Sequence, residues 1–101
     1  MVSVVLVNFR GAEDTIECVR GLLELDWPRA SLEIIVVENG SGDDSLARLQ
    51  KIAEEVTLVE SADNLGFTGG CNLGVSRASG EFIAFLNNDA KPDRGWIREA
   101  I

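Results

Sequence analysis

The alternation of short apolar runs with amphipathic stretches constrains this chain more than any other feature of its sequence. The runs are rich in Val, Ile and Phe and end at polar residues, and they cover residues 2–7, 32–37, 57–59 and 81–86. The first two are typical of strands buried on both faces of a sheet. Apolar spacing between the runs predicts helices from residue 14, after 43–45, over 71–78 and from 93.

Strands that alternate with helices at this spacing imply right-handed crossovers and a parallel sheet. We therefore expect an α/β fold, an open and mostly parallel sheet with helices on both faces, in strand order 3-2-1-4. Ligands of such Rossmann-like sheets bind beyond the carboxyl ends of the strands, where the strand order reverses. This arrangement predicts that Asn8, Glu38, Asn39 and residues 87–89 meet at one rim.

Several local signals predict where the helices begin and end. Asp14 and Glu17 have the spacing of a capping box, and the Trp27-Pro28 pair is expected to close that helix. Gly80 occupies a position suited to a helix C-terminus. The segment 61–70 is rich in Gly, Asn and Asp and is predicted to be a loop that precedes the next helix.

Composition excludes several classes of function. The 101 residues suit one domain or part of one, and 17 acidic against 9 basic residues argue against nucleic-acid binding. The absence of histidine excludes imidazole catalysis, so the chemistry must use carboxylates. Two cysteines without a CxxC pair favour free thiols in the cytoplasm, and neither a membrane span nor a signal peptide is predicted.

Three polar segments are candidates for ligand binding, and each has a structural alternative. The oxygens of Asn87, Asn88 and Asp89 suit Mg²⁺ or Mn²⁺ bridging phosphates, although a plain turn has the same composition. Glu38-Asn39 could accept hydrogen bonds from a ribose or a base, and the alternative is that these residues only form a turn or cap a helix. The Gly66–Gly70 segment allows close approach of a ligand, or is only a connector.

Four segments in the correct order carry a resemblance to a known family. They are VSVVLVNF at residues 2–9, IVVENGS at 35–41, NLGFTGGCNLG at 64–74 and GEFIAFLNNDA at 80–90. Together they resemble the N-terminal donor-binding portion of family 2 inverting glycosyltransferases, which have the GT-A fold. The match is nearest to the rhamnosyltransferase-like branch.

The resemblance implies roles for particular residues. Asp89 stands at the last acid of the DxD-type motif, which contacts the divalent metal, and Asn87 replaces the first acid. The residues implied in nucleotide-sugar binding are Val7, Asn8, Phe9, Glu38, Asn39, Asn64, Gly66, Phe67, Gly70, Asn72, Asn87 and Asn88. Glu38 replaces the Asp that is usual in the family, so its reach to the base or ribose differs by one methylene.

The implied reaction transfers a sugar from a UDP- or dTDP-linked donor to a saccharide or lipid-linked acceptor hydroxyl with inversion, in cell wall or polysaccharide biosynthesis. Residues 1–101 form the donor-binding part, and we expect the acceptor site and the general base beyond residue 101, with no catalytic residue in this fragment. The inner face of the membrane is an alternative location for the full-length protein, and a homodimer is possible at the sheet edge. The alternative function is a non-catalytic nucleotide-binding or receiver-like module, although Asn8-Phe9-Arg10 lacks the acids that receivers carry.

Overall fold

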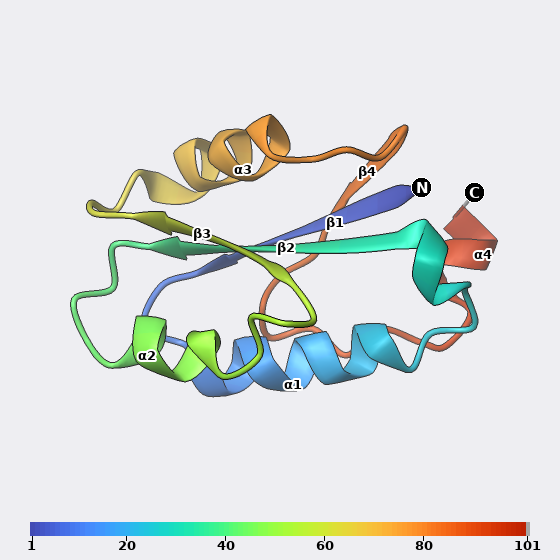
Figure 1. Ribbon diagram of the computed structural model, residues 1–101, viewed down its shortest axis with the longest axis horizontal. Coiled ribbons are helices and arrows are strands. Elements are labelled where there is room, and N and C mark those ends of the chain that lie inside the picture. The colour runs from blue at the N-terminus through green and yellow to red at the C-terminus, as the bar shows by residue number, and fades with distance from the viewer. Residues whose placement is uncertain (101) are drawn as a thin grey trace.

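A four-stranded parallel sheet forms the middle layer of the protein (Figure 1), and the computed structural model describes residues 1–100. The strands lie in the order β3-β2-β1-β4, which confirms the predicted order. Their bounds are β1 (Val2–Asn8), β2 (Leu32–Asn39), β3 (Thr57–Ser61) and β4 (Phe82–Phe85). Each strand pairs in parallel with its neighbours, as right-handed crossovers require.

Helices cover both faces of the sheet, as predicted (Figure 1). The elements outside the sheet are α1 (Ala12–Leu23), a short 3₁₀ turn η1 (Arg29–Ser31), α2 (Ser45–Gln50), α3 (Gly66–Ser76) and α4 (Trp96–Ala100). Helices α1 and α2 lie on one face and α3 lies alone on the other, while α4 lies near the start of β1. None of the helices within residues 1–100 is long and apolar enough to cross a bilayer.

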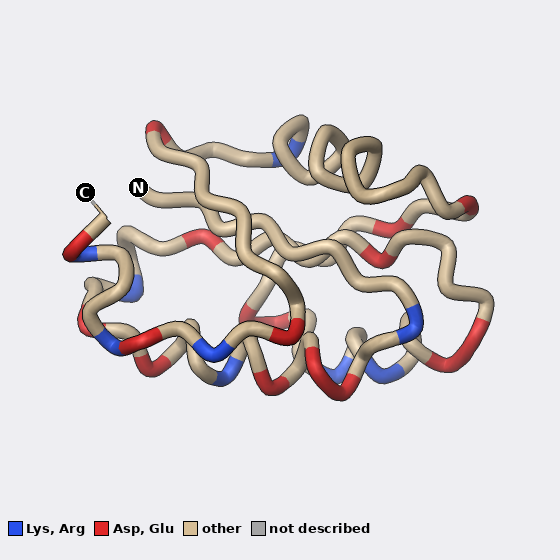
Figure 2. The backbone as a smooth tube through the Cα atoms, turned by 180° about the vertical axis from the view of Figure 1, so that it is seen from behind, with Lys and Arg blue, Asp and Glu red and all other residues tan. Residues whose placement is uncertain are grey.

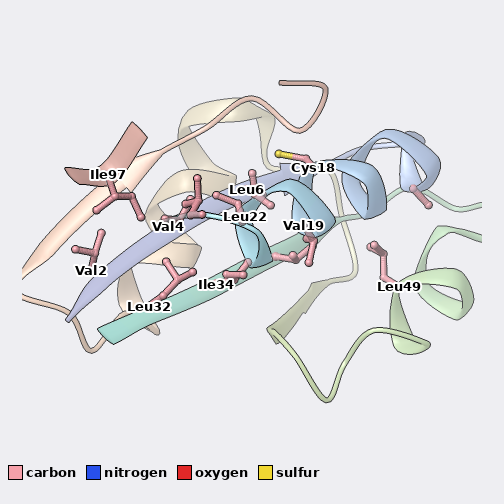
Figure 3. Packing of buried hydrophobic residues seen from close by; sticks show 13 residues of the cluster. Val2, Val4, Leu6, Cys18, Val19, Leu22, Leu32, Ile34, Leu49 and Ile97 are labelled. Atoms are coloured by element: carbon pink, nitrogen blue, oxygen red, sulfur yellow. The ribbon is translucent and has the colours of Figure 1, made fainter. Parts of the chain in front are cut away.

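The two faces of the sheet bury two separate apolar clusters. The larger cluster packs β1 and β2 against α1, with Val4, Leu6 and Ile34 near Val19 and Leu22 (Figure 3). The smaller cluster lies under α3 and consists of the buried residues Val5, Ile35, Val37 and Val59. Because β1 and β2 contribute to both clusters, the prediction that they are buried on both faces is confirmed.

Strand β4 forms an exposed edge of the described sheet. It pairs with β1 alone, and its side chains Phe82, Ile83 and Phe85 are 54, 41 and 50 percent exposed. The apolar character of this run therefore does not reflect burial within residues 1–100. An edge strand with exposed aromatic side chains can pair with another strand.

Several predicted helix ends are wrong. Helix α1 begins at Ala12, its N-cap Gly11 makes no side-chain capping bond, and the helix ends at Leu23, ahead of Trp27. Helix α3 begins at Gly66, so the predicted loop at Gly66–Gly70 forms its first turns. Gly80 does not cap a helix, because α3 already ends at Ser76.

The glycine at position 80 serves close packing. A Cβ built on Gly80 would lie 2.6 Å from Ser3 Oγ, and the Gly80 N–H donates to that oxygen at 2.8 Å. The residue therefore lets the chain entering β4 approach the start of β1. This contact is between segments far apart in sequence, which explains why local turn signals did not predict it.

Helix α3 approaches the sheet closely through two glycines. A Cβ on Gly74 would lie 2.4 Å from Val5 Cγ1 and 3.2 Å from Val37 Cγ2. A Cβ on Gly70 would lie 2.8 Å from Val7 Cγ1. No side chain fits at either position unless the helix or the valines move.

We predict that Gly74→Ala lowers the free energy of unfolding by about 1 to 3 kcal/mol, the usual range for overpacking a core. Urea denaturation followed by far-UV circular dichroism measures this loss. Gly95→Ala is the control, because its nearest contact would be the flexible end of Glu99 at 3.4 Å. Equal midpoints for the two variants would contradict the packing role of Gly74.

Candidate functional site

A depression of about 250 Å³ lies where β1 and β2 end and α3 begins. Its lining comes from segments far apart in sequence, as the argument from parallel strand ends predicts. The lining residues are Val7, Phe9, Asn39, Asn64, Gly66, Phe67 and Asn88. All seven are among the residues for which the family resemblance implies nucleotide-sugar binding.

Asn39 holds the first turn of α3 in place. Its side chain is buried, its Oδ1 accepts from the Leu65 N–H at 3.0 Å, and its Nδ2 donates to the Gly66 carbonyl at 3.0 Å. Asn64 Oδ1 accepts from the Gly66 N–H at 2.8 Å. These two backbone amides are therefore already bonded within the protein and are not donors for a phosphate.

The turn that follows β2 requires glycine at position 40. Gly40 has φ of +69°, and a Cβ there would lie 2.3 Å from the Asp63 carbonyl carbon. This close approach brings the loop after β3, and with it Asn64, against the end of β2. Gly40 thus places one wall of the depression.

Five of the twelve predicted residues lie outside the depression's lining, and two of them, Gly70 and Asn72, belong to α3. Gly70 is buried beneath it against Val7 and Asn39, so its missing side chain serves helix packing. Asn72 is exposed on α3, one residue beyond the buried Cys71.

Asn8 and Glu38 lie below the rim, since they are 0 and 4 percent exposed. Asn8 Nδ2 donates to Glu38 Oε1 at 3.3 Å, directly across the register that pairs β1 with β2. Glu38 also accepts from the Ser41 N–H at 3.3 Å and from the Ser41 hydroxyl. Its carboxylate is satisfied inside the protein, as a buried charge requires.

Two further residues, the buried Thr15 and the exposed Arg10, bond to this network. Thr15 donates from Oγ1 to Asn8 Oδ1 at 2.6 Å and accepts from Asn88 Nδ2 at 3.1 Å. Arg10, with φ of +54°, donates its N–H to Ser41 Oγ at 2.8 Å. Sequence reasoning missed them, although a threonine on the buried face of α1 is a signal, because a buried hydroxyl needs partners.

The segment 87–89 leaves β4 in a turn closed by the Ala90 N–H and the Asn87 carbonyl at 3.0 Å. Asn87 and Asp89 are exposed, and Asn88 is half-buried and bonded to Thr15. Within residues 1–100, Asp89 takes part in no recorded hydrogen bond or ion pair. The backbone of residues 87–90 therefore forms the turn that the alternative interpretation predicted, and the exposed Asp89 carboxylate is still able to bind a ligand.

The donor set around Asp89 fits a cation that arrives with phosphates. Among residues 1–100 no group of three or more Asp, Glu, Cys or His side chains is placed to hold a metal ion. Mg²⁺ usually binds through one or two carboxylates together with substrate phosphates and water. One carboxylate next to two asparagines meets that requirement, but it supplies too few ligands to coordinate the ion without phosphates or water.

Both cysteines are buried and free, and neither is an activated nucleophile. Burial raises the pKa of the Cys18 thiol to about 11, and the nearby Asp89 carboxylate adds to this shift. Burial also raises the pKa of Cys71. Because the thiolate is the reactive form, these shifts favour the packing roles that the sequence indicates.

The negative charge of the protein is concentrated away from α3. Figure 2 shows acidic and basic residues along the layer of α1 and α2, whereas α3 carries no charged residue. Three acids are adjacent in sequence to residues that line the depression: Glu38 before Asn39, Asp63 before Asn64, and Asp89 after Asn88. Of these three, Glu38 is buried and bonded within the protein, whereas Asp63 and Asp89 are exposed.

Comparison with known proteins identifies the fold and the family. The family model described as "Glycosyl transferase family 2" matches residues 3–101. The glycosyltransferase AglE of Haloferax volcanii is 27% identical over 99% of this chain and 34% of its own length.

Two solved structures share the fold over nearly the whole chain. Staphylococcus aureus TarS 1–349 in complex with UDP-GlcNAc matches with a TM-score of 0.83 at 25% identity, over 98% of this chain and 29% of that one. The Pyrobaculum calidifontis mannosyltransferase PcManGT, in complex with GDP-Man and Mn²⁺, matches with a TM-score of 0.86 at 29% identity, over 93% of this chain and 29% of that one.

The chain thus spans about a third of the length of the relatives it matches. The match extends over all four strands and over every residue that lines the depression. It favours the transferase interpretation over the receiver-like alternative. The chain belongs to glycosyl transferase family 2.

Proposed function

We propose that this chain binds the nucleotide diphosphate sugar donor of a glycosyltransferase in the depression between β1, β2 and α3. The observation that carries the proposal is the meeting of Asn39, Asn64, Phe67 and Asn88 in one depression, with the exposed Asp89 the next residue after Asn88. The complexes of TarS with UDP-GlcNAc and of PcManGT with GDP-Man support a nucleotide sugar as the ligand.

The nucleoside base stacks on Phe67 in this proposal. Phe67 lines the depression and is 61 percent exposed, so one ring face is available to a flat ligand. Phe9 also lines it, but the Arg10 guanidinium already lies 5.0 Å from the centre of its ring. A uracil or thymine base suits this arrangement, and the TarS complex with UDP-GlcNAc favours uracil.

A divalent ion, Mg²⁺ or Mn²⁺, is proposed to bind Asp89 together with the donor diphosphate. When bound, it would offset the negative charge that develops on the departing diphosphate. The Mn²⁺ in the PcManGT complex supports this assignment. Asp89 is suited to this role because it lies exposed in the turn that begins directly after β4.

The proposal also includes the identity of the donor sugar, the stereochemistry of transfer and the class of acceptor. We infer rhamnose as the sugar from the resemblance of the segments at 64–74 and 80–90, with galactofuranose or glucose as alternatives. Transfer with inversion to a saccharide or lipid-linked acceptor, in the cytoplasm, completes the proposal. TarS is a poly(ribitol-phosphate) β-N-acetylglucosaminyltransferase, which supports a role in cell wall or polysaccharide synthesis.

We predict that Asp89→Asn removes the Mn²⁺-dependent part of UDP or dTDP binding, because the substitution removes the charged ligand. The loss should exceed about tenfold, since even outer partners of metal ligands contribute 10- to 100-fold. Isothermal titration calorimetry with and without Mn²⁺ measures it. Asp93→Asn makes the same charge change at an exposed position four residues away and should leave binding unchanged. Retention of the full Mn²⁺ effect in Asp89→Asn would refute the metal role.

The base-stacking assignment predicts that Phe67→Ala weakens binding of UDP by about 1 to 3 kcal/mol, the usual contribution of one stacked base. The affinity is measured without metal, so that this effect is separated from that of Asp89. Phe82→Ala is the matched control, because Phe82 has a similar exposed fraction but lies on β4 beyond the depression. If both variants bind UDP equally well, the base does not stack on Phe67.

We also predict that residues 1–101 bind the donor without transferring its sugar, because the acceptor site and general base are proposed to lie outside this segment. Release of UDP from UDP-sugars, measured with excess Mn²⁺ and candidate acceptors, should stay at the uncatalysed rate. Turnover at about 1 s⁻¹ or faster, in the usual range of enzymes, would overturn this assignment.

A further inference from the structure

A line of hydrogen bonds runs from the buried end of β2 to the depression. Asn88 Nδ2 donates to Thr15 Oγ1 at 3.1 Å, Thr15 Oγ1 donates to Asn8 Oδ1 at 2.6 Å, and Asn8 Nδ2 donates to Glu38 Oε1 at 3.3 Å. Asn8, Thr15 and Glu38 are at most 4 percent exposed, whereas Asn88 is half-buried and lines the depression. The line therefore connects a buried carboxylate to a side chain at the proposed ligand site.

Fixed donors determine the direction of this line at its buried end. The Ser41 N–H donates to Glu38 Oε2 at 3.3 Å, and the Ser41 hydroxyl donates to Glu38 Oε1. The hydroxyl proton of Ser41 is free for Glu38 because Ser41 Oγ accepts from the Arg10 N–H at 2.8 Å. Backbone N–H groups can only donate, and an ionised carboxylate can only accept.

The donor and acceptor roles at Glu38 determine those of each side chain that follows. Because Glu38 only accepts, Asn8 presents its NH₂ group to Glu38 and its oxygen to Thr15. Thr15 has one hydroxyl proton and gives it to Asn8, so its oxygen is left to accept from Asn88. Asn88 can meet that oxygen only with its NH₂ group, and its Oδ1 is the end of the amide left for other partners.

Gly11 makes room for this orientation from the other side. A Cβ built on Gly11 would lie 3.0 Å from Asn88 Nδ2. Gly11 is the N-cap of α1 and Thr15 lies in the first turns of that helix, so the start of one element leaves the space for the Asn88 amide and also bonds it. A side chain added at position 11 would press on the Asn88 NH₂ group without removing the Thr15 hydroxyl.

We propose that Thr15 is a positioning residue that turns the Asn88 amide so that Oδ1 is the group offered to the ligand. Asn88 Oδ1 then coordinates a divalent cation or accepts a hydrogen bond from a ribose hydroxyl, and it disfavours a phosphate oxygen, which is itself an acceptor. This inference rests on the proposed function for the ligand, but the orientation of Asn88 is a property of the protein without ligand.

The test compares Thr15→Val, which removes the hydroxyl while keeping the shape, with Thr15→Ser, which keeps the hydroxyl. Side-chain ¹⁵N–¹H spectra of the ligand-free protein report on the Asn88 NH₂ group. We expect slow solvent exchange of its bonded proton in the wild type and in Thr15→Ser, and loss of that protection in Thr15→Val.

The same variants are then titrated with UDP in the presence and absence of Mn²⁺. Thr15→Val should weaken binding by about tenfold, the equivalent of one hydrogen bond, and Thr15→Ser should restore it. An effect seen only with Mn²⁺ assigns Asn88 Oδ1 to the cation, whereas an effect without Mn²⁺ assigns it to a ribose hydroxyl. Either result supports the positioning role.

Gly11→Ala keeps the inference testable if Thr15→Val does not fold. It should shift the Asn88 NH₂ signals and weaken UDP binding while Thr15 is unchanged. Unaltered Asn88 signals or wild-type UDP affinity in the folded variants would overturn the inference. If the wild type binds neither UDP, dTDP nor GDP, the proposed function fails, while the spectra of the ligand-free protein still decide the orientation of Asn88.

Discussion

The enclosure of β1 is the constraint on which the rest of the structure depends. This strand pairs with β2 on one side and β4 on the other, and helices cover both of its faces. Its final residue, Asn8, is fully buried and polar, so the protein must supply its hydrogen-bond partners. Those partners come from β2 and α1, and every buried side-chain N or O atom within residues 1–100 is bonded. Satisfying Asn8 thus fixes three elements at the same edge as the depression.

The sequence allowed the strands, their order and most of the depression to be predicted. Apolar runs identify β1 and β2, and the handedness of crossovers limits the strand order. The carboxyl ends of parallel strands converge, which is why Val7, Asn39 and Asn88 meet although they are far apart in the chain. Asn39 and Asn88 were predicted from the ends of parallel strands, whereas Val7, Phe9, Asn64, Gly66 and Phe67 were predicted from the resemblance to a known family.

The parts that could not be predicted depend on contacts between distant residues. The start of α3 at Gly66 is held by Asn39, which precedes it by a strand and a helix, while a glycine-rich sequence alone favours a loop. Whether Glu38 faces a ligand or the interior depends on how the loop after β2 brings Ser41 back to it. Thr15 becomes significant only once Asn8 and Asn88 lie on either side of its hydroxyl.

The close packing of α3 on the sheet, which Gly70 and Gly74 permit, limits how α3 can move relative to the sheet. Where bulky side chains separate a helix from a sheet, changes of rotamer let the two layers slide past each other. Gly70 places the α3 backbone directly against Val7, and Gly74 places it against Val5, so at these two positions no side chain separates the helix from the sheet. Sliding α3 over the sheet would press its backbone against these valines, so the close contact resists that motion and holds the first turn of α3, which lines the depression, in place.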